Sequence, residues 1–289
     1  MKKIPIYLKL AVVFVLVILS AAAIKGGNGS FDFSQIIAYV ILIIAVFSFG
    51  LFMMFSLENR KERINSIKDS LRKQDAHLLN IYQFSKFFAP SVTEKIINHI
   101  DSYLITQIDY RIEDTDRSSE SLADFFDLAR QIKASTEEQR AVKMRIMNNL
   151  EEISLILKEV SFKATDRMSG YEWISLLALF FVIVFGLFYE NTNSLVCIFI
   201  ISIIATALAL LLFILRELDR LHWQEQYWVW NPLVNLFKEL GLVPYFPEII
   251  FKTNRVAIKK IRGLTKARIA IYKYPYPNFK GKKIKIVKV

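Results

Sequence analysis

Hydrophobic residues gather in four long runs along the chain, separated by polar segments. These runs lie at about 6–24, 36–56, 173–189 and 195–215. An α-helix needs roughly 20 apolar residues to cross the hydrocarbon core of a bilayer, and each run approaches that length. The linkers within each pair of runs are short. The pattern therefore predicts two transmembrane hairpins, at 1–56 and 171–216.

The first run also has features of a secretory signal peptide. Lys2 and Lys3 precede it, and the stretch SAAA near its end resembles a small-residue cleavage region. A second apolar run follows within a few residues and would pair with the first. This favours a span that is retained in the mature protein.

The segment between the hairpins, 57–170, has the periodicity of amphipathic helices, with apolar residues every three or four positions. Three stripes stand out: Ile67, Leu71, Leu78, Ile81 and Phe88; Ile96, Ile97, Ile100, Leu104 and Ile108; and Ile146, Leu150, Ile153, Leu157 and Val160. No helix breaker follows the second span before Pro90, so that span is expected to continue as one long helix. Ser135 and Glu138 have the spacing of a capping box for the last helix.

The three stripes have two interpretations. They form the core of a helical bundle within one chain, which we favour, or they form coiled-coil contacts between subunits.

The C-terminal part of the chain divides into an aromatic segment, 217–247, and a basic tail, 248–289. Four aromatic residues after the last span suit rings at headgroup depth, and they predict interfacial anchors: Trp223, Tyr227, Trp228 and Trp230. Asn231 and Pro232 then predict the start of a short helix. In the tail, KARIAIYKY and KKIKIVKV flank turn residues and predict a β-hairpin. The expected fold is an all-α membrane protein with a small basic tail.

Composition and charge support this picture and orient it. The 289 residues are 54% hydrophobic, mean hydropathy is +0.33 and net charge is +11. Basic and acidic residues nearly balance over 57–170, at 18 against 19, whereas 252–289 hold 13 basic residues and no acidic one. Lysine and arginine flank the spans on one side, so we expect both termini and 57–170 in the cytoplasm of a multi-pass cell (inner) membrane protein.

The basic tail has three interpretations. Anionic lipid headgroups attract polybasic segments beside a membrane, and the candidate residues are Lys259, Lys260, Arg262, Lys282, Lys283 and Lys285. The tail is otherwise a solvated segment that obeys the positive-inside rule. Nucleic acid is the weakest interpretation, because no recognition motif accompanies the charge, and we expect none to bind.

Residue patterns for catalysis, cofactors or metals are missing from the sequence. His77, His99 and His222 lie far apart, and Cys197 is the single cysteine. We therefore expect no enzyme, no cofactor and no metal site. The span interiors also lack the ionisable residues of pumps and coupled transporters. That absence does not exclude a channel, because hydrophobic constrictions can gate a pore.

Two short motifs and the order of the segments resemble the bacterial bestrophin-like family. The motifs are DRMSGYEW at the start of the third run and Leu218-Asp219-Arg220 after the fourth, and the shared layout covers 30–223. The family pattern continues Leu-Asp-Arg with Pro-Phe, whereas this chain continues with Leu221 and His222.

The resemblance implies a relation to anion channels that assemble as rings, with a neck of apolar residues one turn apart on the second span. Ile43, Phe47 and Leu51 have that spacing here. The simpler interpretation is that they face lipid or neighbouring helices. Two hypotheses of function remain: an oligomeric anion channel, or a non-conducting scaffold or sensor whose bundle and tail bind partners or anionic lipid.

Overall fold

The chain is mostly helical in a computed structural model that describes residues 6–23, 33–110, 112, 114, 118–189, 194–221, 227–248, 264–272 and 278–288. Its residues form two compact units. The first, here called the apolar unit, comprises Met1–Ile64 and Arg167–Leu221. The second, here called the polar unit, comprises Asn65–Asp166 and His222–Val289.

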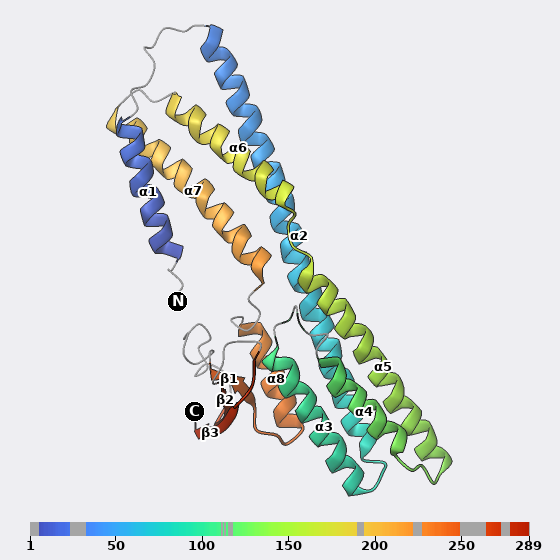
Figure 1. Cartoon of the computed structure of the whole chain (residues 1–289). Coiled ribbons are helices and arrows are strands. Elements are labelled where there is room, and N and C mark those ends of the chain that lie inside the picture. Colours follow the sequence, from blue (N-terminus) through green and yellow to red (C-terminus); the bar gives the residue numbers. More distant parts are fainter. Residues whose placement is uncertain are drawn as a thin grey trace. The chain divides into compact units, whose positions relative to one another are not determined.

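The apolar unit contains α1 (Ile6–Ala23), the first part of α2 (Phe33–Ser85), α6 (Gly170–Tyr189) and α7 (Leu195–Arg220). Helix α1 lies along α7 (Figure 1), and the rings of Phe14 and Phe199 meet edge to face between them at 6.3 Å. The Leu42 side chain of α2 reaches Gly186 of α6, where an added Cβ would lie 2.9 Å from Leu42 Cδ1. Small residues permit such close packing between apolar helices.

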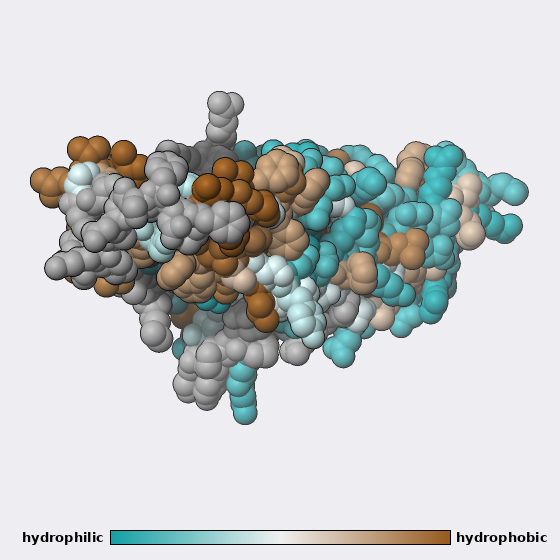
Figure 2. Space-filling model, turned by 90° about the horizontal axis from the view of Figure 1, so that it is seen from above, coloured by the Kyte–Doolittle hydropathy of each residue, from teal (hydrophilic) through white to brown (hydrophobic). Residues whose placement is uncertain are grey.

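Three helical stretches of the described chain are long and apolar enough to cross a membrane. They lie within Ile36–Ser85, Glu137–Tyr189 and Leu195–Arg220, which contain the second, third and fourth predicted spans. The apolar stretch described in α1, Lys9–Ala21, is shorter. Large hydrophobic side chains lie exposed on α1, α2, α6 and α7, and Figure 2 shows brown hydrophobic patches beside a larger teal hydrophilic area. Such a surface suits a lipid environment or contact with other subunits.

The polar unit contains the rest of α2 together with α3 (Pro90–Asp109), α4 (Ser119–Gln131), α5 (Glu137–Thr165) and α8 (Tyr227–Glu239). The predicted long helix is confirmed, because α2 runs unbroken for 53 residues. Most residues of the predicted stripes are buried, including Ile67, Ile100 and Ile146, each with none of its surface exposed. These stripes therefore pack within one chain, as a bundle core does.

Two helix starts differ from their prediction. The cap of α5 is Thr136, whose side chain accepts a hydrogen bond from Gln139 N at 3.1 Å. The capping pattern is thus shifted by one residue from Ser135 and Glu138. Helix α8 begins at Tyr227 and holds Pro232 inside it, so Asn231 is not its first residue. Pro232 is the sixth residue of α8, beyond the first four backbone N–H groups that lack helical partners, so it costs the helix one backbone hydrogen bond.

The tail contributes to a three-stranded sheet in the order β1 (Tyr245–Pro247), β2 (Lys266–Ile271) and β3 (Lys283–Lys288). Strands β2 and β3 are the two predicted strands, and they pair antiparallel with Lys266 opposite Lys288. Strand β1 adds a parallel partner with Tyr245 opposite Arg268. Sequence patterns did not predict this strand, because it is only three residues long and ends at a proline.

Candidate functional site

One face of α2 in the apolar unit presents a stripe of exposed apolar side chains. Ile43 and Phe47 each expose 66% of their surface and Leu51 exposes 39%. Ile36, Val40 and Met54 extend the stripe at spacings of three or four residues, and each exposes about half of its surface. The predicted neck residues therefore share one outward face of α2 within the chain.

The opposite face of α2 packs into the core of the apolar unit. Ala45, Phe49 and Met53 are buried there, and they share a cluster with Leu176 and Ile183 of α6 and with Leu212 and Leu215 of α7. This packing fixes the rotation of α2 about its own axis. The exposed stripe is consequently held outward by the core rather than left free to turn.

A buried ion pair lies at the end of α7, in a cluster of Arg60, Arg63, Met168 and Asp219 that we call the Asp219 junction. Arg60 Nη1 lies 3.5 Å from Asp219 Oδ1, and each side chain exposes 9% of its surface. The Met168 N–H donates to the same carboxylate at 2.8 Å. Arg63 Nη1 donates to the Asp219 carbonyl at 3.0 Å. The junction thereby joins α2, α7 and the segment before α6.

The contacts of the junction pair polar groups that would otherwise be buried without partners. The last carbonyls of a helix lack helical partners, and a cation suits the negative end of the helix dipole. Arg63 satisfies both conditions at the end of α7. Burying Asp219 without Arg60 would leave an uncompensated charge, which is costly at such depth. Helix α7 then stops sharply, because Leu221 adopts the left-handed conformation with φ of 37°.

The segment DRMSGYEW supplies a second structural device beside the junction. Ser169 Oγ accepts a hydrogen bond from Glu172 N at 3.2 Å, and Ser169 N donates to Glu172 Oε2 at 2.6 Å. This reciprocal pair is a capping box that starts α6. Since Met168 N–H in the same segment binds Asp219, the two motifs that carry the family resemblance meet at one place in the fold.

A comparison with known protein families matches residues 8–221 to the Bestrophin-like domain. The chain belongs to the bestrophin-like family. No curated protein and no solved structure is significantly similar to it. The match covers the four apolar helices and the bundle between them, and it ends at Leu221, the last residue of the apolar unit. In this bestrophin-like chain, α8 and the sheet lie beyond the matched domain.

A partly buried arginine connects the sheet to α3. Arg268 of β2 makes two hydrogen bonds to the Asp101 carboxylate, at 2.7 Å and 2.5 Å. Its Nε donates to the Val243 carbonyl at 2.8 Å, and its guanidinium lies over the ring of Phe237. This bidentate contact fixes the orientation of the guanidinium relative to the carboxylate as well as the distance between them. The beginning of β2 is therefore held rigidly against α3.

A second carboxylate, Asp109, gathers polar groups at the end of α3. The hydroxyls of Tyr245 and Tyr272 both donate to its Oδ1, and Lys282 donates to its Oδ2. Burial, and then the Asp109 charge, raise the pKa of both tyrosines above their usual value. The phenols therefore stay protonated as donors at every ordinary pH.

This arrangement separates the predicted lipid-binding lysines into two groups. Lys282 is bound to Asp109 and lies over the Tyr245 ring at 5.2 Å, so its charge is already paired. Lys283 and Lys285 lie exposed on β3 and have no ion-pair partner among the described residues. Lys259, Lys260 and Arg262 lie outside the described residues.

The predicted aromatic anchors have different outcomes. Trp230 is fully buried, with its ring 5.1 Å from that of Phe246, so it packs in the core of the polar unit instead of at the exposed position that a headgroup anchor needs. Tyr227 and Trp228 belong to the first turn of α8, and Trp223 lies outside the described residues. For these three the anchoring role stays a prediction.

A groove of about 220 Å³ between α2 and α8 is lined in part by a carboxyl whose pKa is raised. Asp75, on its wall with Arg72 and Glu239, has a pKa raised to about 7 by burial. The nearby Tyr103 hydroxyl is fully buried without a hydrogen-bond partner in the described chain, and burial, followed by the Asp75 charge, raises the pKa of Tyr103. Asp75 is thus a titratable group of the polar unit near neutral pH.

The described residues contain no group of three histidine, cysteine or carboxylate side chains that could hold a metal ion. The contacts that sequence reasoning missed are all polar: Asp219 with Arg60, Asp101 with Arg268, and Asp109 with its phenols. The Ser-x-x-Glu spacing at 169–172 was a signal for one of them, the capping box of α6. The others join positions far apart in the chain and carry no local pattern.

Proposed function

We propose that this bestrophin-like protein is a four-span protein of the cell (inner) membrane that assembles into a ring and conducts anions. The observation that carries the proposal is the outward stripe of Ile43, Phe47 and Leu51 on α2. In a ring, the same face of each subunit can meet around one axis. A monomer of four apolar helices offers no comparable pathway for an ion.

The chemistry of the stripe suits a gate better than a binding site. Its side chains are apolar, so they give a permeating ion no ligand and close a narrow neck by excluding water. Anion preference would come from the field of lysines and arginines around the cytoplasmic mouth. These include the arginines at the end of α7, Arg216 and Arg220.

The proposed topology places both termini and residues 57–170 in the cytoplasm. It is tested with single cysteines in a Cys197→Ser background, expressed in cells. A membrane-impermeant thiol reagent should label Thr192→Cys, between α6 and α7, in intact cells. Lys283→Cys on β3 should react only after the cells are lysed. Labelling of Lys283→Cys in intact cells would contradict the topology.

The channel is tested by chloride flux into liposomes that contain the purified full chain, together with its mass in detergent. We expect a ring-sized oligomer and flux above that of empty liposomes. Phe47→Trp should lower the flux several-fold because it narrows the neck. Phe185→Trp is the matched control, since Phe185 of α6 exposes 72% of its surface and Phe47 exposes 66%.

Two results of that experiment would reject the channel. One is a monomer or dimer without flux. The other is an equal effect of the Phe47 and Phe185 substitutions on flux, because the α2 stripe would then not be the surface that lines the ion pathway.

A second candidate function is a non-conducting scaffold or sensor whose tail binds anionic lipid. The observation in its favour is the pair of exposed lysines on β3, Lys283 and Lys285, beside exposed Ile286. Each lysine near an anionic surface contributes about 1 kcal/mol. The scaffold is favoured if flux is absent while Lys283→Gln/Lys285→Gln weakens binding of the tail to anionic vesicles.

A further inference from the structure

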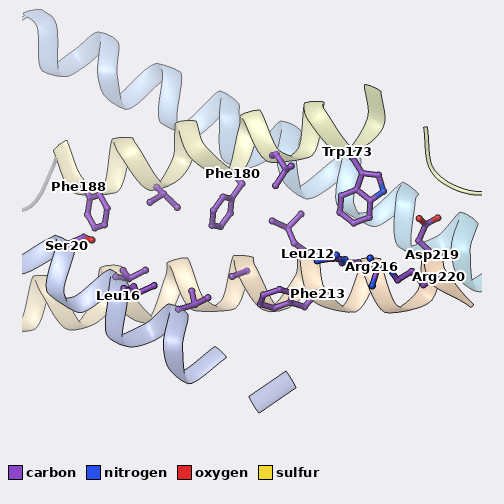
Figure 3. A pocket seen from close by; sticks show the side chains of 15 residues that line it. Leu16, Ser20, Trp173, Phe180, Phe188, Leu212, Phe213, Arg216, Asp219 and Arg220 are labelled. Atoms are coloured by element: carbon purple, nitrogen blue, oxygen red, sulfur yellow. The ribbon is translucent and has the colours of Figure 1, made fainter. Parts of the chain in front are cut away.

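The apolar unit has an open cavity of about 670 Å³ between α1, α6 and α7. Its walls are apolar along most of their length, formed by residues such as Leu16 of α1, Phe180 of α6 and Leu212 of α7 (Figure 3). The volume lies in the range of pockets that bind small molecules, roughly 300–1,000 Å³. An acyl chain fits these walls, because they offer almost no polar partner along the cavity.

The charged groups of the cavity gather at one end. Arg216, Asp219 and Arg220 of α7 lie there beside Trp173 of α6, whereas Ser20 and Phe188 lie at the other end (Figure 3). The cavity therefore has the two-part character of an amphiphile, with an apolar length and a charged end.

The charged end carries an excess of positive charge. The carboxylate of Asp219 is already bound by Arg60 and by the Met168 N–H. Arg216 and Arg220 are exposed and have no hydrogen-bond or ion-pair partner among the described residues. Lys9 of α1 adds a third cation, since its ammonium lies 5.6 Å from the centre of the Phe213 ring on the cavity wall.

We propose that this cavity binds one anionic phospholipid, with an acyl chain between α1, α6 and α7 and the headgroup phosphate at Arg216 and Arg220. Guanidinium groups bind phosphate oxygens through paired hydrogen bonds. Trp173 suits the level where chain and headgroup meet, because its ring is apolar and its indole N–H is a donor. The site differs from the basic tail, which was the expected lipid-binding region.

The test is native mass spectrometry of the detergent-solubilised full chain, titrated with phosphatidylglycerol or phosphatidylcholine. We expect one phosphatidylglycerol per chain at low lipid concentration and clearly weaker binding of phosphatidylcholine. Arg216→Gln/Arg220→Gln should weaken phosphatidylglycerol binding about 30-fold, as expected for the loss of two cations near a headgroup. The matched control is Lys283→Gln/Lys285→Gln, which removes the same charge from β3 and should bind like the unchanged chain.

A second variant tests the acyl part independently of charge. Val184→Trp places a large ring in the cavity wall and should displace the lipid while both arginines remain. Thermal unfolding without added lipid shows whether each variant is folded, and Phe185→Trp on the neighbouring position of α6 controls for an added indole.

Three results would overturn the proposal. The first is equal affinity for the two lipids, and the second is unchanged binding in the double arginine variant. The third is tighter binding of a free fatty acid than of phosphatidylglycerol, because the cavity would then take a carboxylate amphiphile instead of a phospholipid. None of these readouts depends on ion conduction.

Discussion

The two units of the chain bury charge in opposite ways. The polar unit distributes its buried and partly buried polar contacts along α3, where Asp101 and Asp109 hold the sheet through Arg268, Tyr245 and Lys282. The apolar unit concentrates buried charge at the Asp219 junction, at the end of its helices. In hydrocarbon a polar group must find its partners within the protein, which favours few polar sites near the helix ends.

The two units also differ in what an apolar side chain indicates. In the polar unit, most residues of the predicted apolar stripes are core residues, as Ile96, Ile100 and Leu104 are. In the apolar unit, Phe47 and Phe49 are both apolar, yet one exposes 66% of its surface and the other 2%. Lipid and protein core are similar solvents for such side chains, so hydrophobicity does not distinguish the faces of α2.

The largest effect is expected from breaking the Asp219 junction. Asp219→Ala removes the carboxylate that compensates buried Arg60 and accepts the Met168 N–H. Loss of one partner of a buried ion pair costs about 3–5 kcal/mol, so the melting temperature in detergent should drop strongly or the protein should fail to accumulate. Asp219→Asn keeps an acceptor for Met168 and should be less damaging.

The control for this prediction is Asp127→Ala in the polar unit. Asp127 pairs with Arg130 at 3.2 Å, but the two side chains are about two-thirds exposed, and exposed ion pairs contribute at most about 1 kcal/mol. Equal losses from Asp219→Ala and Asp127→Ala would mean that the junction carries no special structural role.

A smaller effect on stability should distinguish buried apolar residues of the polar unit from exposed apolar residues of α2. Ile100→Ala in α3 empties a fully buried site and should lower the free energy of unfolding by about 2–5 kcal/mol. Ile43→Ala makes the same chemical change at a position that is 66% exposed, and it should leave stability nearly unchanged. Chemical denaturation of the purified variants measures both. A large loss from Ile43→Ala in a monomeric preparation would show that α2 buries a different face.

Much of the polar unit could be predicted from the sequence. Its helices face water on one side and the core on the other, so polar and apolar residues alternate with helical periodicity. The long helix through α2, the stripes of α3 and α5 and the strands β2 and β3 all follow from local periodicity and composition. The buried faces of the apolar helices and the polar contacts could not be predicted. Asp219 and Arg60 are more than 150 positions apart, and each looks locally like an ordinary residue at the end of a span.

The smallest effect concerns pH in the polar unit. The folded-state pKa of Asp75 is about 7 against an ordinary value of 3.8, because burial disfavours its charge. The folded state therefore binds this proton more tightly than the unfolded state does, and the contribution of Asp75 to stability falls as pH rises from about 4 to 7.

Asp75→Asn removes that titration. Because the Asp75 side chain is only partly buried, solvent screens part of this effect. The variant should be more stable than the unchanged chain by about 1–2 kcal/mol at pH 8, with little difference near pH 4. Denaturation midpoints at the two pH values provide the measurement. An equal gain in stability at pH 4 and at pH 8 would mean that the effect has a cause other than ionisation of Asp75.

If the Ile43, Phe47 and Leu51 face of α2 lines an anion pathway, a charged group attached at Phe47 during flux should block that pathway. In a Cys197→Ser background, Phe47→Cys is reconstituted and treated with a negatively charged thiol reagent while chloride flux is recorded. We expect modification of Phe47→Cys to block the flux and the same treatment of Phe185→Cys to leave it unchanged. The pathway along α2 would be contradicted if modification of Phe47→Cys left the chloride flux unchanged, or if only modification of Phe185→Cys blocked it.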